Sequence, residues 1–451
     1  MVWTTYAGVV RSSRRLGWRI GLPAVILVIA ALSMAPTRGT VLQLRADGVV
    51  VEPGGVVATV PADSGAAFIP GTSVLSSANR DDPAVAARID DDRDWLADGV
   101  VPGHGTRYHA MAERALLDLR ALTGPTGALM AAPVTAWKHV WPRDASFAAA
   151  AYAVTGHDRE AADVLGFLAD VAPWDGEWEA RYLADGSGPP DDRPKQLDSA
   201  GWVLWAVWLV SREVEPDVAA EMLEELRPAV IASANAIVRS LGDDDLPAPS
   251  SDYWEKDESD LTLGVAAPAS LGLRAALALA PLIDVEDPFV WTNAARRLDH
   301  AIEREFAPHG YPRTPPDGGA DAAVTFLAPP FAPATAPVTD AVRATEIALR
   351  VPNGGHRPGE AWRKDVDVAW TPETALLALA MAGNGDHTDA HRLVTFLDTY
   401  RTPLGSLPEK VDAEAAPASV APLAWTSSLV LLTLTELEHG LPVVPRAPDS
   451  P

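Results

Sequence analysis

The sequence predicts an all-α protein whose helices form an (α/α)6 barrel, a toroid with two concentric helical layers. Three observations lead to this fold class. From about residue 106 the apolar periodicity is helical in eleven segments, with no convincing strand between them. Several segments, such as residues 271–280, are rich in Ala and Leu on more than one face, which is typical of helices buried on two sides. Short turns alternate with long loops, so the long loops should all emerge at one end of the barrel.

The predicted helices cover residues 107–123, 143–155, 158–171, 197–213, 216–241, 260–280, 286–306, 338–350, 372–383, 386–400 and 421–439. The long connections, rich in Pro, Gly and Trp, are 172–196, 242–259, 308–337, 351–370 and 401–420. Loops of that length in a compact domain usually carry function. An α-solenoid is the alternative, although no side-chain signature repeats at a constant period.

The first 37 residues predict a signal peptide or a signal-anchor helix. Four arginines between residues 11 and 19 precede an uncharged, largely apolar run over 20–37. The run is at the lower length limit for a membrane-spanning helix, so an uncleaved anchor and cleavage near Ala35 both remain open. The expected location is extracytoplasmic, either anchored to the membrane by this segment or secreted.

Two further regions flank the predicted barrel domain, which covers residues 105–440. Residues 38–104 combine short Val-rich runs broken by Gly and Pro, which predict a few strands, with an acidic segment over 81–98 that favours a short helix. Residues 441–451 are a short Pro-rich tail.

Composition excludes several classes of protein. With 451 residues, 48% of them apolar and 22% charged, the chain is globular rather than disordered or fibrous. The formal charge of −25 repels phosphate backbones, so nucleic acid is not an expected partner. The absence of cysteine removes disulfides and Cys-ligated metals. Fifteen Trp against eight Phe and seven Tyr is unusual, because flat indole faces are costly to expose unless they pack or bind something, and stacking on sugar rings is one such use.

The first two candidate motifs contain polar residues that suit hydroxyl groups. In residues 137–144, Arg143 and Asp144 lie beside indoles, and charged hydrogen bonds from such a pair can grip vicinal hydroxyls. The alternative is that Asp144 only caps a helix. In residues 193–201, Gln196 and Asp198 offer further partners for hydroxyls, although this motif alone is weak.

The other two motifs each contain a carboxylate in a loop. Glu255 follows a Tyr-Trp pair, and apolar aromatic walls disfavour the ionised form, which suits a general acid. A plain surface glutamate is the alternative. Glu409 follows a proline and suits a general base that activates water, although a salt bridge with Lys410 is the commoner fate of such a residue. Two carboxylates flanking an aromatic cleft indicate glycoside cleavage.

With all four motifs in order, the chain resembles glycoside hydrolase family 15, the glucoamylase and glucodextranase group, over roughly residues 105–440. The resemblance implies an (α/α)6 catalytic barrel and inversion at the anomeric carbon. It implies that Glu255 is the general acid and Glu409 the general base, with carboxyl groups about 6.5 to 9.5 Å apart. The substrate-binding residues that the resemblance implies are Trp141, Arg143, Asp144, Arg193, Gln196 and Asp198. Trp254, Trp370 and Trp425 are candidate walls of the same pocket. Trp137 is a further candidate for the wall.

The expected activity is therefore that of an exo-acting, inverting α-glucosidase on oligo- or polysaccharides. A trehalase of the same family and a non-hydrolytic carbohydrate-binding toroid are the alternatives. No cofactor is expected, and no His or carboxylate cluster shows metal-ligand spacing. The linkage cleaved, the sugar itself and the oligomeric state stay open.

Overall fold

The computed structural model describes residues 39–52 and 56–448. The predicted signal or anchor segment, residues 1–37, lies outside the described residues. Within them, one helical stretch, Leu263–Leu282, is long and apolar enough to cross a membrane, and 89% of its apolar window is buried inside the protein. That stretch belongs to the core of the barrel described next.

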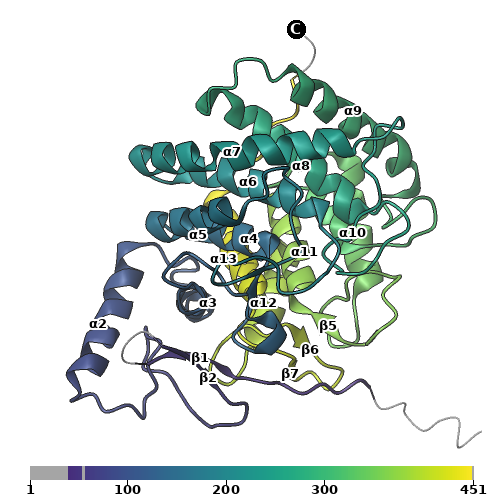
Figure 1. Cartoon of the computed structure of the whole chain (residues 1–451). Helices are drawn as coiled ribbons and strands as arrows, with labels where there is room; N and C mark the ends of the chain where they lie inside the picture. The colour runs from purple at the N-terminus through teal and green to yellow at the C-terminus, as the bar shows by residue number, and fades with distance from the viewer. Residues whose placement is uncertain (1–38, 53–55, 449–451) are drawn as a thin grey trace, which may run out of the picture. The chain divides into compact units, whose positions relative to one another are not determined.

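The described chain forms a helical toroid with an inner ring and an outer ring (Figure 1). The inner ring contains α4 (Pro142–Val154), α6 (Leu197–Glu213), α8 (Leu263–Leu279), η4 (Ala322–Leu327), α11 (Thr371–Gly383) and α13 (Ala424–His439). Each inner element contacts the next, and α13 contacts α4, so the ring closes. The outer ring contains α3 (His109–Leu122), α5 (Asp158–Val171), α7 (Pro216–Ser240), α9 (Phe289–Glu305), α10 (Ala336–Leu349) and α12 (His387–Thr399). Each outer helix packs mainly on one inner element, and α5, α7 and α10 also contact the next one.

Side-chain patterns explain which helices lie inside. The inner helix α4 is buried at almost every position, because its run of Ala side chains lets neighbouring backbones approach from all sides. The outer helix α9 is buried only at positions spaced three and four apart, such as Trp291, Ala294 and Leu298. The layers therefore follow from whether a helix is apolar all round or on one stripe.

The eleven predicted helices are confirmed, with bounds within three residues of the expected ones. The twelfth position of the barrel is the six-residue 3-10 helix η4, in a segment that the sequence predicted to be loop. Asp321 caps η4 by accepting a hydrogen bond from the Ala323 amide. Pro329 and Pro330 follow it closely, and proline cannot donate the bond that would extend a helix. A segment this short shows no helical periodicity, which is why the sequence pattern missed it.

The region before the barrel has the expected few strands and short helix. β1 (Gly48–Val51) pairs antiparallel with β2 (Val57–Val60), and Val49 and Val51 pack against Ala121 of α3. The acidic segment forms α2 (Pro83–Asp98), whose first turn is capped by Asp82.

The long loops lead from outer helices into the N-terminal ends of inner elements, while the returning connections are mostly short. Two small antiparallel sheets tie these loops together: β3 (His139–Val140) with β4 (Tyr182–Leu183), and β5 (Ala369–Trp370) with β6 (Lys410–Val411) and β7 (Pro417–Ala418). Short 3-10 helices complete the connections: η1 (Thr135–Trp137), η2 (Ala280–Leu282) and η3 (Ala307–His309). The expectation that the long loops gather at one end of the barrel is confirmed.

Candidate active site

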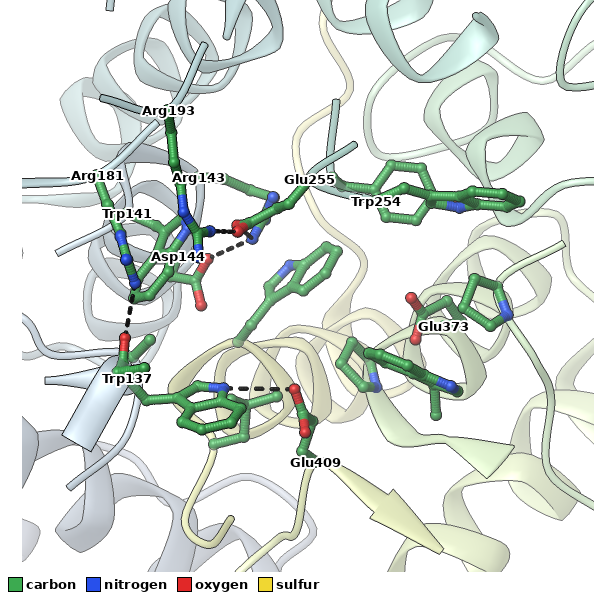
Figure 2. A pocket seen from close by; sticks show the side chains of 18 of the residues that line it. Trp137, Trp141, Arg143, Asp144, Arg181, Arg193, Trp254, Glu255, Glu373 and Glu409 are labelled. Atoms are coloured by element: carbon green, nitrogen blue, oxygen red, sulfur yellow. Dashed lines mark hydrogen bonds and ion pairs between the residues drawn. The ribbon is translucent and has the colours of Figure 1, made fainter. Parts of the chain in front are cut away.

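A pocket of about 280 Å³ opens among these loops, at the N-terminal ends of the inner helices. This volume is just below the usual range for small-molecule sites, about 300 to 1,000 Å³. Ten of the residues singled out in the sequence line it: Trp137, Trp141, Arg143, Asp144, Arg193, Trp254, Glu255, Trp370, Glu409 and Trp425. Figure 2 shows Glu255 and Glu409 on opposite sides of this pocket, with Arg143 and Asp144 on a third side.

Asp144 lies in the first turn of α4, but it does not cap the helix. Trp141 occupies the N-cap position without a side-chain cap bond, Pro142 follows it, and Asp144 comes in the third helical position. Its Oδ2 accepts a hydrogen bond of 3.0 Å from Nη2 of Arg143. Burial raises the pKa of Asp144 to about 6, although the Arg143 charge opposes this shift. The capping alternative is therefore wrong, and the carboxyl is available to the pocket.

Arg143 connects three parts of the pocket. Besides its bond to Asp144, its Nη2 lies 3.8 Å from Oε1 of Glu255. Its guanidinium carbon lies 4.4 Å from the ring centroid of Trp425, in α13. A planar guanidinium is suited to stacking on an indole while its edge bonds to carboxylates. Arg143 thus contacts side chains from α4, from the loop before α8 and from α13.

Glu255 projects from a tight turn before α8. Its backbone has a φ of 53°, and its amide donates a 2.7 Å bond to the carbonyl oxygen of Asp252. A non-glycine residue in this left-handed region costs free energy, and such strain concentrates at functional sites. Arg193 donates to Oε2 of Glu255. Two arginines therefore flank this carboxyl in addition to the expected aromatic residues.

The turn that carries Glu255 is held by buried ion pairs. Oδ1 of Asp252 accepts a 2.9 Å bond from the Trp254 amide. Arg313 lies 2.9 Å from Oδ2 of Asp252 and 3.2 Å from Oδ2 of Asp321. Its guanidinium also lies 3.6 Å from the ring centroid of Trp254. This network fixes both the turn and the indole beside it.

Glu409 lies on the loop between α12 and α13 and is 8% exposed. Ser419 donates a hydrogen bond to its Oε2, and the Trp137 indole donates to Oε1 at 3.4 Å. Lys410 lies 3.8 Å from Oε2, with its ammonium over the Trp370 ring. The salt bridge that the sequence suggested as an alternative is present, and Glu409 lines the pocket as well.

Gln196 and Asp198 do not line the pocket, although the family resemblance placed them among the substrate-binding residues. Gln196 is 2% exposed and donates to the carbonyl oxygen of Asp252 at 3.4 Å. Asp198 is 1% exposed, and its charge acts on Arg143 from behind the pocket wall. Burial raises the pKa of Asp198 to about 7. They act through neighbours of the pocket, Gln196 through its bond to Asp252 and Asp198 through its charge near Arg143.

The pocket contains further polar and aromatic residues that the sequence analysis did not select: Arg181, Tyr253, Trp362 and Glu373. A sequence pattern could have identified Glu373. Trp370, Pro372 and Glu373 at the start of α11 repeat the order of Trp141, Pro142 and Asp144 at the start of α4, with the acid three residues after the indole in both. Arg181 and Trp362 come from the middle of long loops, where no local pattern distinguishes them.

The described residues contain no cluster of His, Asp and Glu that could hold a metal ion. The polar lining of the pocket instead consists of carboxyl and guanidinium groups framed by indole rings. Such a lining can bind the hydroxyls of a sugar, stack on its faces and transfer protons.

No family model matches the chain. It is 39% identical over 93 residues to a trehalase of Mycolicibacterium smegmatis, and the match covers 18% of this chain and 14% of that protein. A solved glycosidase superposes with a TM-score of 0.65 at 20% identity, covering 74% of this chain and 97% of that one. A bacterial glucoamylase complexed with acarbose superposes with a TM-score of 0.63 at 17% identity, covering 79% of this chain and 59% of that one. The chain thus has the helical toroid fold of the glucoamylases, and its resemblance to glycoside hydrolase family 15 is confirmed at the level of the fold.

Proposed function

We propose that this protein is a glycoside hydrolase that removes terminal glucose from α-linked oligo- or polysaccharides with inversion at the anomeric carbon. The observation that carries the proposal is the placement of Glu255 and Glu409 on opposite sides of one small pocket lined by indoles (Figure 2). A small pocket suits a chain end better than the interior of a polymer, which favours exo action.

The proposed reaction moves two protons. Glu255 gives one to the leaving oxygen on one side of the sugar, and Glu409 takes one from water on the other side. Glu255 in its protonated form gives its proton to the glycosidic oxygen, and the bond between that oxygen and the anomeric carbon breaks. Glu409 takes a proton from a water molecule, whose oxygen attacks the opposite face of that carbon. Arg143 and Asp144 hold the ring hydroxyls while positive charge develops on the sugar. The product is β-glucose from an α-linked substrate.

A trehalase activity is the second candidate, because the relative with the matching segment is a trehalase. Trehalose also presents a terminal α-linked glucose, so the same two carboxyl groups would act on it. We also propose an extracytoplasmic location, on the basis of the basic and apolar segment within residues 1–37. N-terminal sequencing of the mature protein from a membrane fraction and from the medium would distinguish an anchor from a cleaved signal.

Proton NMR of the full chain mixed with maltotriose, isomaltotriose, panose or trehalose tests the activity. Early appearance of β-glucose is expected from at least one of these substrates, and the substrate cleaved identifies the linkage. Early α-glucose would contradict inversion. Binding without cleavage of any of these sugars, by a protein shown to be folded, would favour the carbohydrate-binding toroid instead.

A further inference from the structure

A third glutamate lies in the pocket and has no part in the reaction described above. Glu373 occupies the third position of α11, lines the pocket and is 3% exposed. In Figure 2 its carboxyl group lies across the pocket from Asp144. An acidic residue in the first turn of a helix often serves only the helix dipole or a capping box.

Glu373 does not form a capping box, although its carboxyl accepts a bond from its own amide. In a capping box, the acid at the third position would bond to the N-cap amide. Here the N-cap amide, that of Trp370, donates to the carbonyl oxygen of His356 at 2.8 Å. The Thr371 amide donates to the carbonyl oxygen of Glu409 at 3.0 Å. Both amides therefore have other acceptors.

Glu373 also differs from the other carboxyl groups of the pocket. Arg143 donates to Asp144, Arg193 donates to Glu255, and Ser419 and Trp137 donate to Glu409. Among the described residues, no group of another residue donates a hydrogen bond to the Glu373 carboxyl, and its Oε2 has no partner at all. A buried carboxylate whose one bond comes from its own amide is costly, so the neutral acid is the favoured form.

The charges around Glu373 favour the neutral acid as well. Burial raises the pKa of Glu373 to about 8. The bond from its own amide opposes this rise, and the nearby Glu409 charge adds to it. Arg143 opposes the rise and Asp321 adds to it. Tyr253, whose hydroxyl donates to Asp321, also interacts electrostatically with Glu373. The bond from the Thr371 amide to the Glu409 carbonyl oxygen fixes the spacing between Glu373 and Glu409, since it joins the first turn of α11 to the loop that carries the proposed base.

We propose that Glu373 is a further substrate-contacting residue, a neutral carboxyl whose O–H donates a hydrogen bond to a hydroxyl of the terminal sugar. This inference rests on the proposed function and extends it. The sugar would be held from two sides, by the Arg143–Asp144 pair at the start of α4 and by Glu373 at the start of α11. A neutral acid on this wall also avoids placing a second negative charge beside Glu409.

Binding measurements separate this role from a structural one. The parent protein is the Glu255→Gln variant, which should bind without hydrolysis, and the probes are maltose and trehalose. Tryptophan fluorescence reports binding, because several indoles line the pocket. In this background, Glu373→Gln preserves a neutral hydrogen-bonding side chain, whereas Glu373→Leu preserves only the approximate volume. Asp389→Asn removes a half-exposed carboxylate on α12 and is the charge control.

At pH 6 the Glu373→Gln variant should bind as tightly as the parent within about threefold, while Glu373→Leu should bind about tenfold more weakly or worse. From pH 6 to 9 the parent and the Asp389→Asn control should lose affinity as Glu373 ionises. The Glu373→Gln variant should keep its affinity, because its amide does not ionise.

Equal binding by the Gln and Leu variants, or an alkaline loss of affinity retained in Glu373→Gln, would overturn the inference. If Glu373→Leu does not fold, the pH profile of Glu373→Gln decides alone. If the wild-type protein cleaves no sugar and the parent binds neither disaccharide, the proposed function fails and the inference with it. If the wild-type protein is active and the Glu373 variants bind like the parent at every pH, only the inference fails.

Discussion

Arg313 lies 2.9 Å from Asp252, and both side chains are almost completely withdrawn from solvent. The pair holds the turn from which Glu255 projects, since Asp252 also accepts the Trp254 amide. Removing one partner of a buried ion pair costs about 3 to 5 kcal/mol, because the other charge stays buried without compensation.

The Arg313→Gln variant should therefore melt roughly 5 °C below the wild type. It should also lose activity, because the turn that carries Glu255 is no longer fixed. Arg343→Gln, which removes half of an exposed pair with Asp386, is the matched control and should melt with the wild type. Equal midpoints for both variants, in scanning calorimetry, would show that the Arg313 network does not support the fold.

The two proposed catalytic glutamates can be told apart by the leaving group. Glu255→Gln and Glu409→Gln should each lower kcat on an α-linked disaccharide by about 10² to 10⁴. With α-glucosyl fluoride, Glu255→Gln should recover most of its activity, because fluoride departs without a proton from the enzyme. Glu409→Gln should stay inactive, because water must still be deprotonated. Recovery of the Glu409 variant instead would exchange the two roles.

Arg143→Lys should lower kcat/KM by about 10- to 100-fold. Lysine keeps the charge but cannot stack a planar group on Trp425 while bonding to Asp144. A charge-assisted hydrogen bond contributes about 1.5 to 3 kcal/mol, which corresponds to that range of rates. Initial rates over a range of substrate concentrations give the value, and an unchanged kcat/KM would mean that only the charge matters.

The contribution of three buried acids to stability should fall as the pH rises from about 4 to 8. The pKa values of Asp144, Asp198 and Glu373 are raised by burial to about 6, 7 and 8. At these three groups the folded state therefore binds more protons than the unfolded chain between about pH 4 and 8. Their contribution is complete below pH 4 and is lost as the pH rises through the folded-state values.

Melting curves of the Asp198→Asn variant test this prediction, since asparagine resembles the protonated acid. The drop in melting temperature between pH 5 and pH 8 should be smaller in this variant than in the wild type. The same substitution at the half-exposed Asp389 should leave the drop unchanged. A full-sized drop in the Asp198 variant would mean that this carboxyl does not contribute to the pH dependence.

Gly359 provides a test of the pocket wall. A methyl group added there would lie 2.6 Å from Cζ2 of Trp254 and 2.7 Å from Oδ2 of Asp321, so one of them must move. Gly359→Ala should therefore lower kcat/KM about tenfold or more, through a displaced indole. Gly166→Ala is the control. Gly166 lies in the middle of α5, and a methyl group added there would meet only the Glu225 carboxyl, at 3.7 Å. That variant should be fully active and slightly more stable, since alanine favours a helix over glycine by roughly 0.5 to 1 kcal/mol.

Local sequence patterns are sufficient for most of the helices. The Ala-rich run of α4 and the apolar stripe of α9 each predict a helix and the layer in which it lies. They are not sufficient for η4, whose six residues are held inside the ring by Asp321 and the packing of its neighbours. A segment too short to show periodicity depends on its surroundings.

Local sequence patterns likewise predict part of the site, and the folded surroundings decide the rest. Glu255 and Glu409 stand beside aromatic, proline and lysine residues that make them recognisable in the sequence. The arginines that flank Glu255 approach it from α4 and from the loop before α6, far along the chain. Gln196 and Asp198, which look like ligands in the sequence, lie behind the wall.

The sequence by itself thus determined the helical periodicity, the order of the motifs and the identity of two loop carboxylates, because these depend on neighbours along the chain. Only the tertiary structure decided which side chains share the pocket and which carboxyl groups have raised pKa values there. Closing the ring brings the first turns of α4 and α11 to the same pocket. The burial and the charges that set the pKa of Glu373 come from residues such as Arg143, which is 230 positions away in the sequence. Electrostatic interaction depends on distance in space, and that distance exists only in the folded chain.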